Sequence, residues 1–367
     1  YPRNPEMSTT ETEIKRLIEN EIDPYLGKDL ISSGALKNIH THDQGTTVEI
    51  ELGFPIDNYR EILVRRLESL CAGLSVGNID FQVSSKILAR EVQKGTKPLS
   101  QVKNIIAIAS GKGGVGKSTT AANLAIALQQ EGGKVGVLDA DIYGPSQTRM
   151  LGTQGRPDSK DGKSMEPKVS YQLQTMSIGN LIEEDTPMIW RGPMATGALE
   201  QLINDTNWDD LDYLIIDLPP GTGDIQLTLC QKIPVSGAVI VTTPQDIALL
   251  DARKGLKMFE KVNVPVLGVI ENMSVHICSK CGHSEHIFGS GGGESMAKQY
   301  EIEMLGSLPL DIRIREGVDN GRPTTAIEPD SEIAKSYREI ARKIAARLAL
   351  KARDFSSKFP KIVIQNT

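Results

Sequence analysis

Two groups of residues in this 367-residue chain have the types and spacing that chemistry requires. One is the glycine-rich stretch GKGGVGKSTT at 111–120, and the other is Cys278 and Cys281, a Cys-x-x-Cys pair. The remaining cysteines, Cys71 and Cys230, are each isolated in the sequence. Because a zinc ion or an iron–sulfur cubane usually takes four protein ligands, one Cys-x-x-Cys pair supplies only half of a thiolate site.

The glycine-rich stretch fits two nucleotide-binding patterns. Its glycines at 111, 113 and 116 match the G-x-G-x-x-G of dinucleotide sites, and Gly111-x-x-x-x-Gly116-Lys117-Ser118 matches the P-loop. A dinucleotide site has no use for a lysine and a hydroxyl directly after the last glycine. A triphosphate site needs Lys117 on the β- and γ-phosphates and Ser118 on Mg²⁺. The sequence therefore predicts an ATP–Mg²⁺ site.

Backbone N–H groups of this loop are expected to point at the phosphates, because they lie at the N-terminus of the following helix. The residues that we expect to bind the nucleotide here are Gly111, Lys112, Gly113, Gly114, Val115, Gly116, Lys117, Ser118 and Thr119.

Acidic residues end two of the apolar, strand-like segments. YLIID ends in Asp217, which is expected to be a direct or outer-sphere Mg²⁺ carboxylate, and VLDAD ends in Asp139 and Asp141. Asp141 is our candidate for the carboxylate that orients the attacking water. For Asp139, a capping or metal-shell role and a catalytic role are both open.

Lys112 is a second lysine inside the loop. If its side chain points away from its own phosphates, it can reach only the nucleotide of a neighbouring subunit, which predicts a homodimer. The stretch KGGVGKST resembles the deviant Walker A, or signature-lysine, ATPases, in which this lysine crosses a dimer interface. Nitrogenase iron protein and the partition and division-site ATPases belong to that class.

A homodimer would also complete the cysteine site, because a two-fold axis through the metal brings in two more thiolates. Within one chain, the alternative is a zinc knuckle completed by His276, His283 or His286, and spacing alone favours zinc. The P-loop context, together with the family resemblance described next, reverses this preference and favours a labile cluster. A redox dithiol is a third interpretation.

Four further motifs resemble the Mrp/ApbC family of P-loop ATPases that carry iron–sulfur clusters. They are WRGPM (190–194), DADIYGPS (139–146), DLPPGTGD (217–224) and ENMSVHICSKCGHSEHIFGSGGGE (271–294), and the resemblance covers roughly 100–350.

This resemblance implies that Cys278 and Cys281 ligate a [4Fe–4S] cluster bridging two chains, and that Asn272 contacts the adenine. It further implies a carrier that receives clusters from scaffold proteins and transfers them to apo iron–sulfur proteins. ATP hydrolysis would be slow, since such a carrier uses nucleotide to switch between holding and releasing states.

The fold class predicted is α/β. From 103 to 352, near-continuous apolar strands alternate with helices, which indicates a mainly parallel sheet covered by helices on both faces. Residues 93–102 are expected to be a linker. Residues 1–6, which precede Met7, are expected to be a vector-derived remnant or a processed end, and 353–367 a tail.

Residues 7–92 are expected to form a small α/β domain. Helices are predicted over 11–26, with Pro24 at the end, and over 59–74, with Cys71 in the core; strands are predicted over 46–54 and 79–85. The domain is similar to the iron–sulfur-assembly type, although Gly53 stands where some such domains carry a reactive cysteine. His40 and His42 could be ligands, but solvated polar positions are favoured.

Composition narrows the function classes. The formal net charge of −6 offers no basic field to gather nucleic acid, and no apolar run approaches the roughly 18–20 residues that span a bilayer. With few cysteines and no secretory leader, a cytoplasmic protein is expected.

A different class of function remains open, a partition or division-type ATPase that acts on a membrane or on DNA and holds a structural zinc. The basic, amphipathic stretch 331–353 favours it. Against it, the apolar stripe of this stretch is expected to close the domain by packing on the sheet. The stripe consists of Ile333, Tyr337, Ile340, Ile344 and Leu348.

Overall fold

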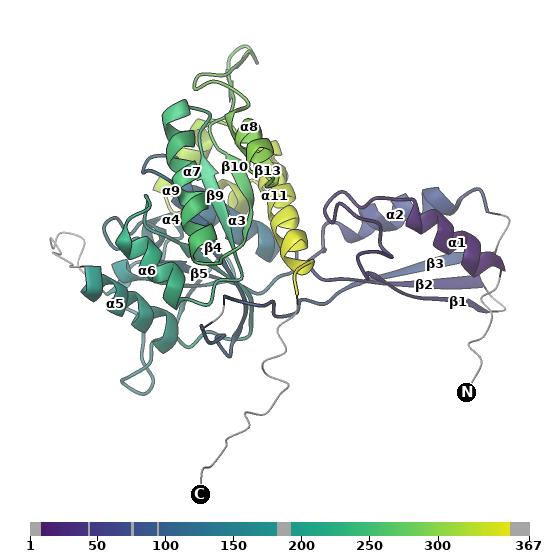
Figure 1. Cartoon of the computed structure of the whole chain (residues 1–367), viewed down its shortest axis with the longest axis horizontal. Coiled ribbons are helices and arrows are strands. Elements are labelled where there is room, and N and C mark those ends of the chain that lie inside the picture. Colours follow the sequence, from purple (N-terminus) through teal and green to yellow (C-terminus); the bar gives the residue numbers. More distant parts are fainter. Residues whose placement is uncertain (1–8, 43–44, 75–76, 94, 182–191, 353–367) are drawn as a thin grey trace, which may run out of the picture.

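The computed structural model describes residues 9–42, 45–74, 77–93, 95–181 and 192–352 (Figure 1). The predicted remnant 1–6, the tail 353–367 and the first two residues of the WRGPM motif, Trp190 and Arg191, lie outside the described residues. The small sheet contains β1 (Leu36–His42), β2 (Gly45–Leu52) and β3 (Ile79–Ser85). The large sheet contains β4 (Val102–Ala109), β5 (Val135–Asp139), β6 (Lys168–Ser170), β7 (Leu173–Ser177), β8 (Leu211–Asp217), β9 (Gly237–Thr242), β10 (Val266–Glu271) and β13 (Met304–Ser307).

The small sheet is covered by α1 (Thr9–Glu19) and α2 (Arg60–Cys71). Strand β2 pairs antiparallel with β1 and parallel with β3, and its residues alternate between buried and half-buried, as a sheet with one covered face requires. Helix α1 ends five residues before Pro24, so the predicted helix was too long. The carboxylate of Asp23 accepts the backbone N–H groups of Tyr25 and Leu26, which favours a turn over another helical turn.

The large sheet has the strand order β13-β10-β9-β4-β8-β5-β7-β6, and all neighbours are parallel except β6 and β7. The helices that accompany it are α3 (Lys117–Gln130), α4 (Gln147–Met150), α5 (Gly192–Asp205), α6 (Asp224–Lys232), α7 (Asp246–Lys261), α8 (Gly292–Gln299), α9 (Ile312–Asp319), α10 (Thr324–Ile327) and α11 (Glu332–Ala349).

Alternate residues of the strands point to opposite faces of this sheet. Ile106 and Ile108 of β4 belong to the core beneath α3 and α11, whereas Ile105 and Ala107 belong to the core beneath α5, α6 and α7. The predicted mainly parallel sheet with helices on both faces is therefore confirmed.

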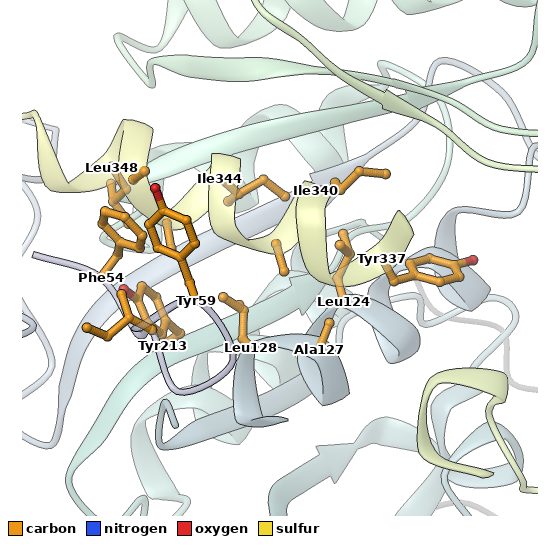
Figure 2. Packing of buried hydrophobic residues seen from close by; sticks show 14 of the residues in the cluster. Phe54, Tyr59, Leu124, Ala127, Leu128, Tyr213, Tyr337, Ile340, Ile344 and Leu348 are labelled. Atoms are coloured by element: carbon orange, nitrogen blue, oxygen red, sulfur yellow. The ribbon is translucent and has the colours of Figure 1, made fainter. Parts of the chain in front are cut away.

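Helix α11 carries the apolar stripe predicted to close the domain, and all five residues of the stripe are buried. Figure 2 shows α11 beside Leu124, Ala127 and Leu128 of α3, with Ile340 and Ile344 on the opposite side of the helix in this view; these residues belong to one buried cluster. The stripe is therefore part of the core and is covered by protein. One basic residue of this helix, Arg342, is buried and forms an ion pair with Glu131.

The small unit lies against the ends of α3 and α11, and its core is continuous with theirs. The N–H of Asp57 donates to the carbonyl of Glu131 (2.9 Å), and the Asn58 amide donates to the carbonyl of Gln130 (2.8 Å). The Arg342 guanidinium lies over the rings of Tyr25 and Tyr59, 5.5 and 5.8 Å from their centroids. Figure 2 shows Phe54 and Tyr59 beside Leu348 and Leu128.

The connection between the two units forms neither a helix nor a strand over the described part of 86–101. It is nevertheless held in place, because the buried amide of Gln93 donates to the carbonyls of Cys230 and Ile233. Among the helices that the structure describes, none combines the length and the apolar character needed to cross a bilayer.

Candidate functional site

The glycine-rich loop connects β4 to α3, as the P-loop pattern predicts. Gly114 and Gly116 have φ of +82° and +80°, which favours glycine. A Cβ on Gly116 would lie 2.2 Å from the Asn272 amide nitrogen, and one on Gly111 would lie 2.1 Å from the carbonyl carbon of Asp251 in α7. The loop is therefore pressed between β10 and α7, and only glycine fits at these two positions.

Lys117 begins α3 and lies within a cluster of acidic residues at the carboxyl ends of β5 and β8. Its ammonium donates to Asp217, lies 3.7 Å from Asp141, and donates to the hydroxyl of Ser118 (3.2 Å). Asp217 is fully buried, so an unpaired charge there would be strongly unfavourable. Lys117 therefore compensates the carboxylates that are predicted to face Mg²⁺ and water. Burial also raises the pKa of Asp141.

Asp139 ends β5 and organises the loop that follows it. One oxygen accepts the N–H of Asp141 (3.1 Å), and the other accepts the N–H groups of Ser146 (2.9 Å) and Gln147 (3.0 Å) and the hydroxyl of Ser177 (3.1 Å). Burial raises the pKa of Asp139 to about 7, and the charge of Asp217 adds to this rise. Of the roles left open for this residue, these contacts match the capping role.

Gln147 belongs to the site but was missed by sequence reasoning. Its amide nitrogen donates to the carbonyl of Ser118 (2.9 Å) and to Asp217 (2.9 Å), and its side chain is buried. The only signal in the sequence was its position directly after the DADIYGPS motif.

Asn272 directly follows β10, and its amide donates to the carbonyl of Val115 in the loop (2.9 Å). The residue predicted to contact the adenine therefore also supports the P-loop backbone. Lys112 is half-buried, and no carboxylate among the described residues forms an ion pair with its ammonium. Gly113, Gly114 and Thr119 lie in the loop and the first turn of α3 as expected.

Cys278 and Cys281 lie on a hairpin formed by β11 (His276–Ile277) and β12 (Ser284–Glu285). The N–H of Cys278 donates to the backbone carbonyl of His283, and the N–H of Gly282 donates to the backbone carbonyl of Cys278. Cys278 is half-exposed and Cys281 exposed. The backbone N–H groups of Lys280 and Cys281 donate to the sulfur of Cys278 and lower the pKa of this thiol. A lower pKa favours the thiolate, which is the form that binds metal.

Two of the three histidines in this segment, His276 and His286, form hydrogen bonds with backbone carbonyls. A ring nitrogen of His276 bonds the carbonyl of Leu310 (3.0 Å), and one of His286 bonds the carbonyl of Ser274 (2.6 Å). Over the described ranges, no three His, Cys, Asp or Glu side chains come together in a group that could hold a metal ion.

The histidines of the small sheet and the isolated cysteines lie apart from these groups. His40 and His42 are exposed on β1 and bond the neighbouring side chains of Asn38 and Thr47. Cys71 and Cys230 are buried, Cys71 in the core of the small unit as predicted.

Comparison with known proteins gives a consistent assignment. Residues 101–345 match the family model described as NUBPL iron-transfer P-loop NTPase, and residues 11–75 match the iron–sulfur cluster assembly protein model. The chain is 59% identical to an iron–sulfur cluster carrier protein of Pseudomonas fragi, covering 73% of this chain and 96% of the relative. It is 52% identical to the carrier protein of Salmonella typhimurium, covering 89% of each.

A mouse relative, the iron–sulfur cluster transfer protein NUBPL, is 49% identical over 73% of this chain and 84% of its own length. Among solved structures, a nucleotide-binding protein from Archaeoglobus fulgidus in complex with ADP is 37% identical, with a TM-score of 0.54 over 61% of this chain and 88% of that one. The cell division ATPase MinD of Pyrococcus furiosus is 25% identical, with a TM-score of 0.51 over 66% and 98%.

The P-loop at the head of α3, the acidic strand ends and the exposed Cys-x-x-Cys hairpin thus occur in a chain that belongs to the iron-transfer P-loop NTPase family, the Mrp/ApbC family of iron–sulfur cluster carriers, with an iron–sulfur-assembly-type unit at its N-terminal side.

Proposed function

We propose that this protein is an ATP-dependent iron–sulfur cluster carrier. Two copies would hold one [4Fe–4S] cluster between Cys278 and Cys281 of each chain, hydrolyse ATP slowly, and transfer the cluster to apo iron–sulfur proteins. The cluster is cargo that upstream scaffold proteins would supply. The names of the relatives support the carrier role, and the arrangement of the two thiols is the observation that carries it.

The thiol pair fits a cluster held at an interface between chains. Both cysteines lie on a projecting hairpin, and one of them is exposed, so a second chain can approach the sulfurs. Within the described residues no third ligand completes a site in one chain. Four thiolates are the usual complement of a cubane cluster, and a two-fold axis supplies them.

The residues at the P-loop fit ATP and Mg²⁺. Lys117 would move from Asp217 and Asp141 to the β- and γ-phosphates, and Ser118 with Asp217 would hold the metal. The metal, when bound, would neutralise charge on the phosphate oxygens. Asp141 would orient the attacking water, and Asn272 would contact the adenine. Lys112, without an ion-pair partner in the described part of its own chain, would act across the dimer.

The proposal is tested by anaerobic reconstitution, with UV–visible and Mössbauer spectra and counts of iron, sulfide and zinc. We expect about four iron and four sulfide per dimer, and dimerisation that depends on the cluster. Cys278→Ala and Cys281→Ala should each abolish cluster binding, because each removes two of four ligands. ATPase activity should survive in both variants, whereas transfer to an apo-acceptor should not.

Cys71→Ala and Cys230→Ala are the matched controls, because both cysteines are buried away from the hairpin and should leave the cluster intact. If the protein as isolated holds one zinc per monomer and loses it on His283→Ala, the site is a zinc knuckle within one chain, and the proposal of a shared cluster is wrong. Binding of the protein to vesicles in an ATP-dependent manner would instead favour the partition-type ATPase, although the apolar stripe of α11 that suggested it is buried.

A further inference from the structure

Gln147 connects the two residues that are expected to hold Mg²⁺. Its amide nitrogen donates to the carbonyl of Ser118 in the first turn of α3 and to one carboxylate oxygen of Asp217 at the end of β8, both at 2.9 Å. Because both partners can only accept, the nitrogen and oxygen of this amide are assigned by the contacts themselves.

The position of Gln147 is itself determined by the site. Its backbone N–H donates to Asp139 (3.0 Å), and its side chain is 2% exposed at the start of α4. Its amide oxygen is buried and has no hydrogen-bond partner among the residues that the structure describes. A buried acceptor without a donor is unfavourable, so this oxygen marks a place where a donor from a ligand would be stabilising.

The two oxygens of Asp217 have different partners. Lys117 donates to one, and Gln147 donates to the other. If Lys117 moves to the phosphates when nucleotide binds, Gln147 is the side-chain donor within the described part of the chain that remains on Asp217. The carboxylate would then keep its orientation without its lysine.

From this geometry we propose that Gln147 is a positioning residue for metal-bound nucleotide. Its amide nitrogen keeps the Asp217 carboxylate in register with Ser118, and its amide oxygen would be available to a donor that arrives with the ligand. The proposal rests on the proposed function in one respect, namely that the P-loop binds nucleotide with Mg²⁺. Outer-shell partners of this kind typically affect metal affinity by tenfold or more.

The test measures the affinity of the full-length protein for fluorescent N-methylanthraniloyl-ADP, once with excess Mg²⁺ and once with EDTA. Gln147→Met keeps the length of the side chain and removes both hydrogen-bonding atoms. We expect the affinity of this variant to fall about tenfold in Mg²⁺, and to stay within about twofold of the unmodified protein in EDTA. The effect of Gln147 would then lie in the metal-dependent part of binding.

Gln93→Met is the matched control, because Gln93 is also a buried amide that donates to two carbonyls, but at the connection between the units. It should leave both affinities unchanged. If Gln147→Met does not fold, Gln147→Asn serves in its place, because it keeps the amide but withdraws it from Asp217. We expect a smaller loss, again only in Mg²⁺.

Two outcomes would overturn the inference alone. One is an unchanged affinity of the Gln147 variants in Mg²⁺; the other is an equal loss of affinity with and without Mg²⁺, which would indicate a purely structural role. If the unmodified protein binds the ADP analogue no better with Mg²⁺ than with EDTA, the proposed nucleotide site itself fails, and the inference falls with it.

Discussion

At the scale of single residues, the nucleotide site is a cluster of buried charges that compensate one another. Lys117→Ala should reduce ATP hydrolysis at least about 100-fold, because it removes the charge expected on the β- and γ-phosphates. It should also lower the free energy of unfolding by about 3 kcal/mol, because Asp217 remains buried without its cation. Phosphate-release assays and urea denaturation measure the two effects.

The Lys112→Ala variant distinguishes the role of Lys112 from that of Lys117. The Lys112 side chain is half-buried and has no ion-pair partner in the described part of the chain, so stability should change by less than about 0.5 kcal/mol. Nucleotide binding should remain measurable while hydrolysis is lost, since the proposed action is across the dimer. Full ATPase activity in this variant would remove the signature-lysine interpretation.

The thiols should differ in their pH profiles of alkylation. Backbone N–H groups lower the pKa of Cys278, so its thiolate persists to lower pH than that of a free cysteine, whose pKa is about 8.5. Burial raises the pKa of Cys71, and raises that of Cys230 to about 12. In the reduced protein without metal, mass spectrometry of iodoacetamide reaction should therefore show Cys278 modified below pH 8, with Cys71 and Cys230 protected. Equal profiles would contradict this.

At the scale of elements, α11 acts as the closing helix of the large unit. Ile340 is buried and packs against Gly306 of β13, where a Cβ on the glycine would lie 2.7 Å from the isoleucine. Ile340→Asp should lower the free energy of unfolding by at least about 3 kcal/mol, because a carboxylate would be buried without a partner. Lys335→Asp, on the exposed side of the same helix, is the control and should change it by less than about 1 kcal/mol. Melting curves and vesicle co-sedimentation distinguish a core helix from a membrane helix. If α11 were a membrane helix, the Ile340→Asp variant would remain folded and would lose vesicle binding.

At the scale of the whole molecule, the small unit formed by β1–β3, α1 and α2 packs against the ends of α3 and α11 in the large unit. The ion pair of Arg342 with Glu131 (2.8 Å) is almost entirely buried and lies against Tyr25. Arg342→Met should lower the free energy of unfolding by about 3–5 kcal/mol, since Glu131 would keep a buried, unpaired charge.

The double variant Arg342→Met with Glu131→Gln should recover most of this loss, because it removes the unpaired charge. Chemical denaturation of both variants measures it, and a double variant as unstable as the single one would show that packing of the arginine matters more than charge.

The sequence by itself determined the features that depend on local patterns. The P-loop could be predicted because its glycines, lysine and hydroxyl act through backbone conformation within eight residues, and the parallel sheet because each strand is apolar along its whole length. The half-site of Cys278 and Cys281 was visible for the same reason. Asp139, Asp141 and Asp217 could be placed together because the carboxyl ends of parallel strands meet at one edge.

Only the tertiary structure decided which distant side chains meet. Gln147 and Asp217 are 70 residues apart, and Arg342 and Glu131 are 211 apart. Their contacts depend on the order of the strands and on the angle at which α11 crosses α3, neither of which leaves a periodic signal in the sequence. The charge of Arg342 alone would favour an exposed position, but pairing with a buried carboxylate lets this side chain lie inside the protein.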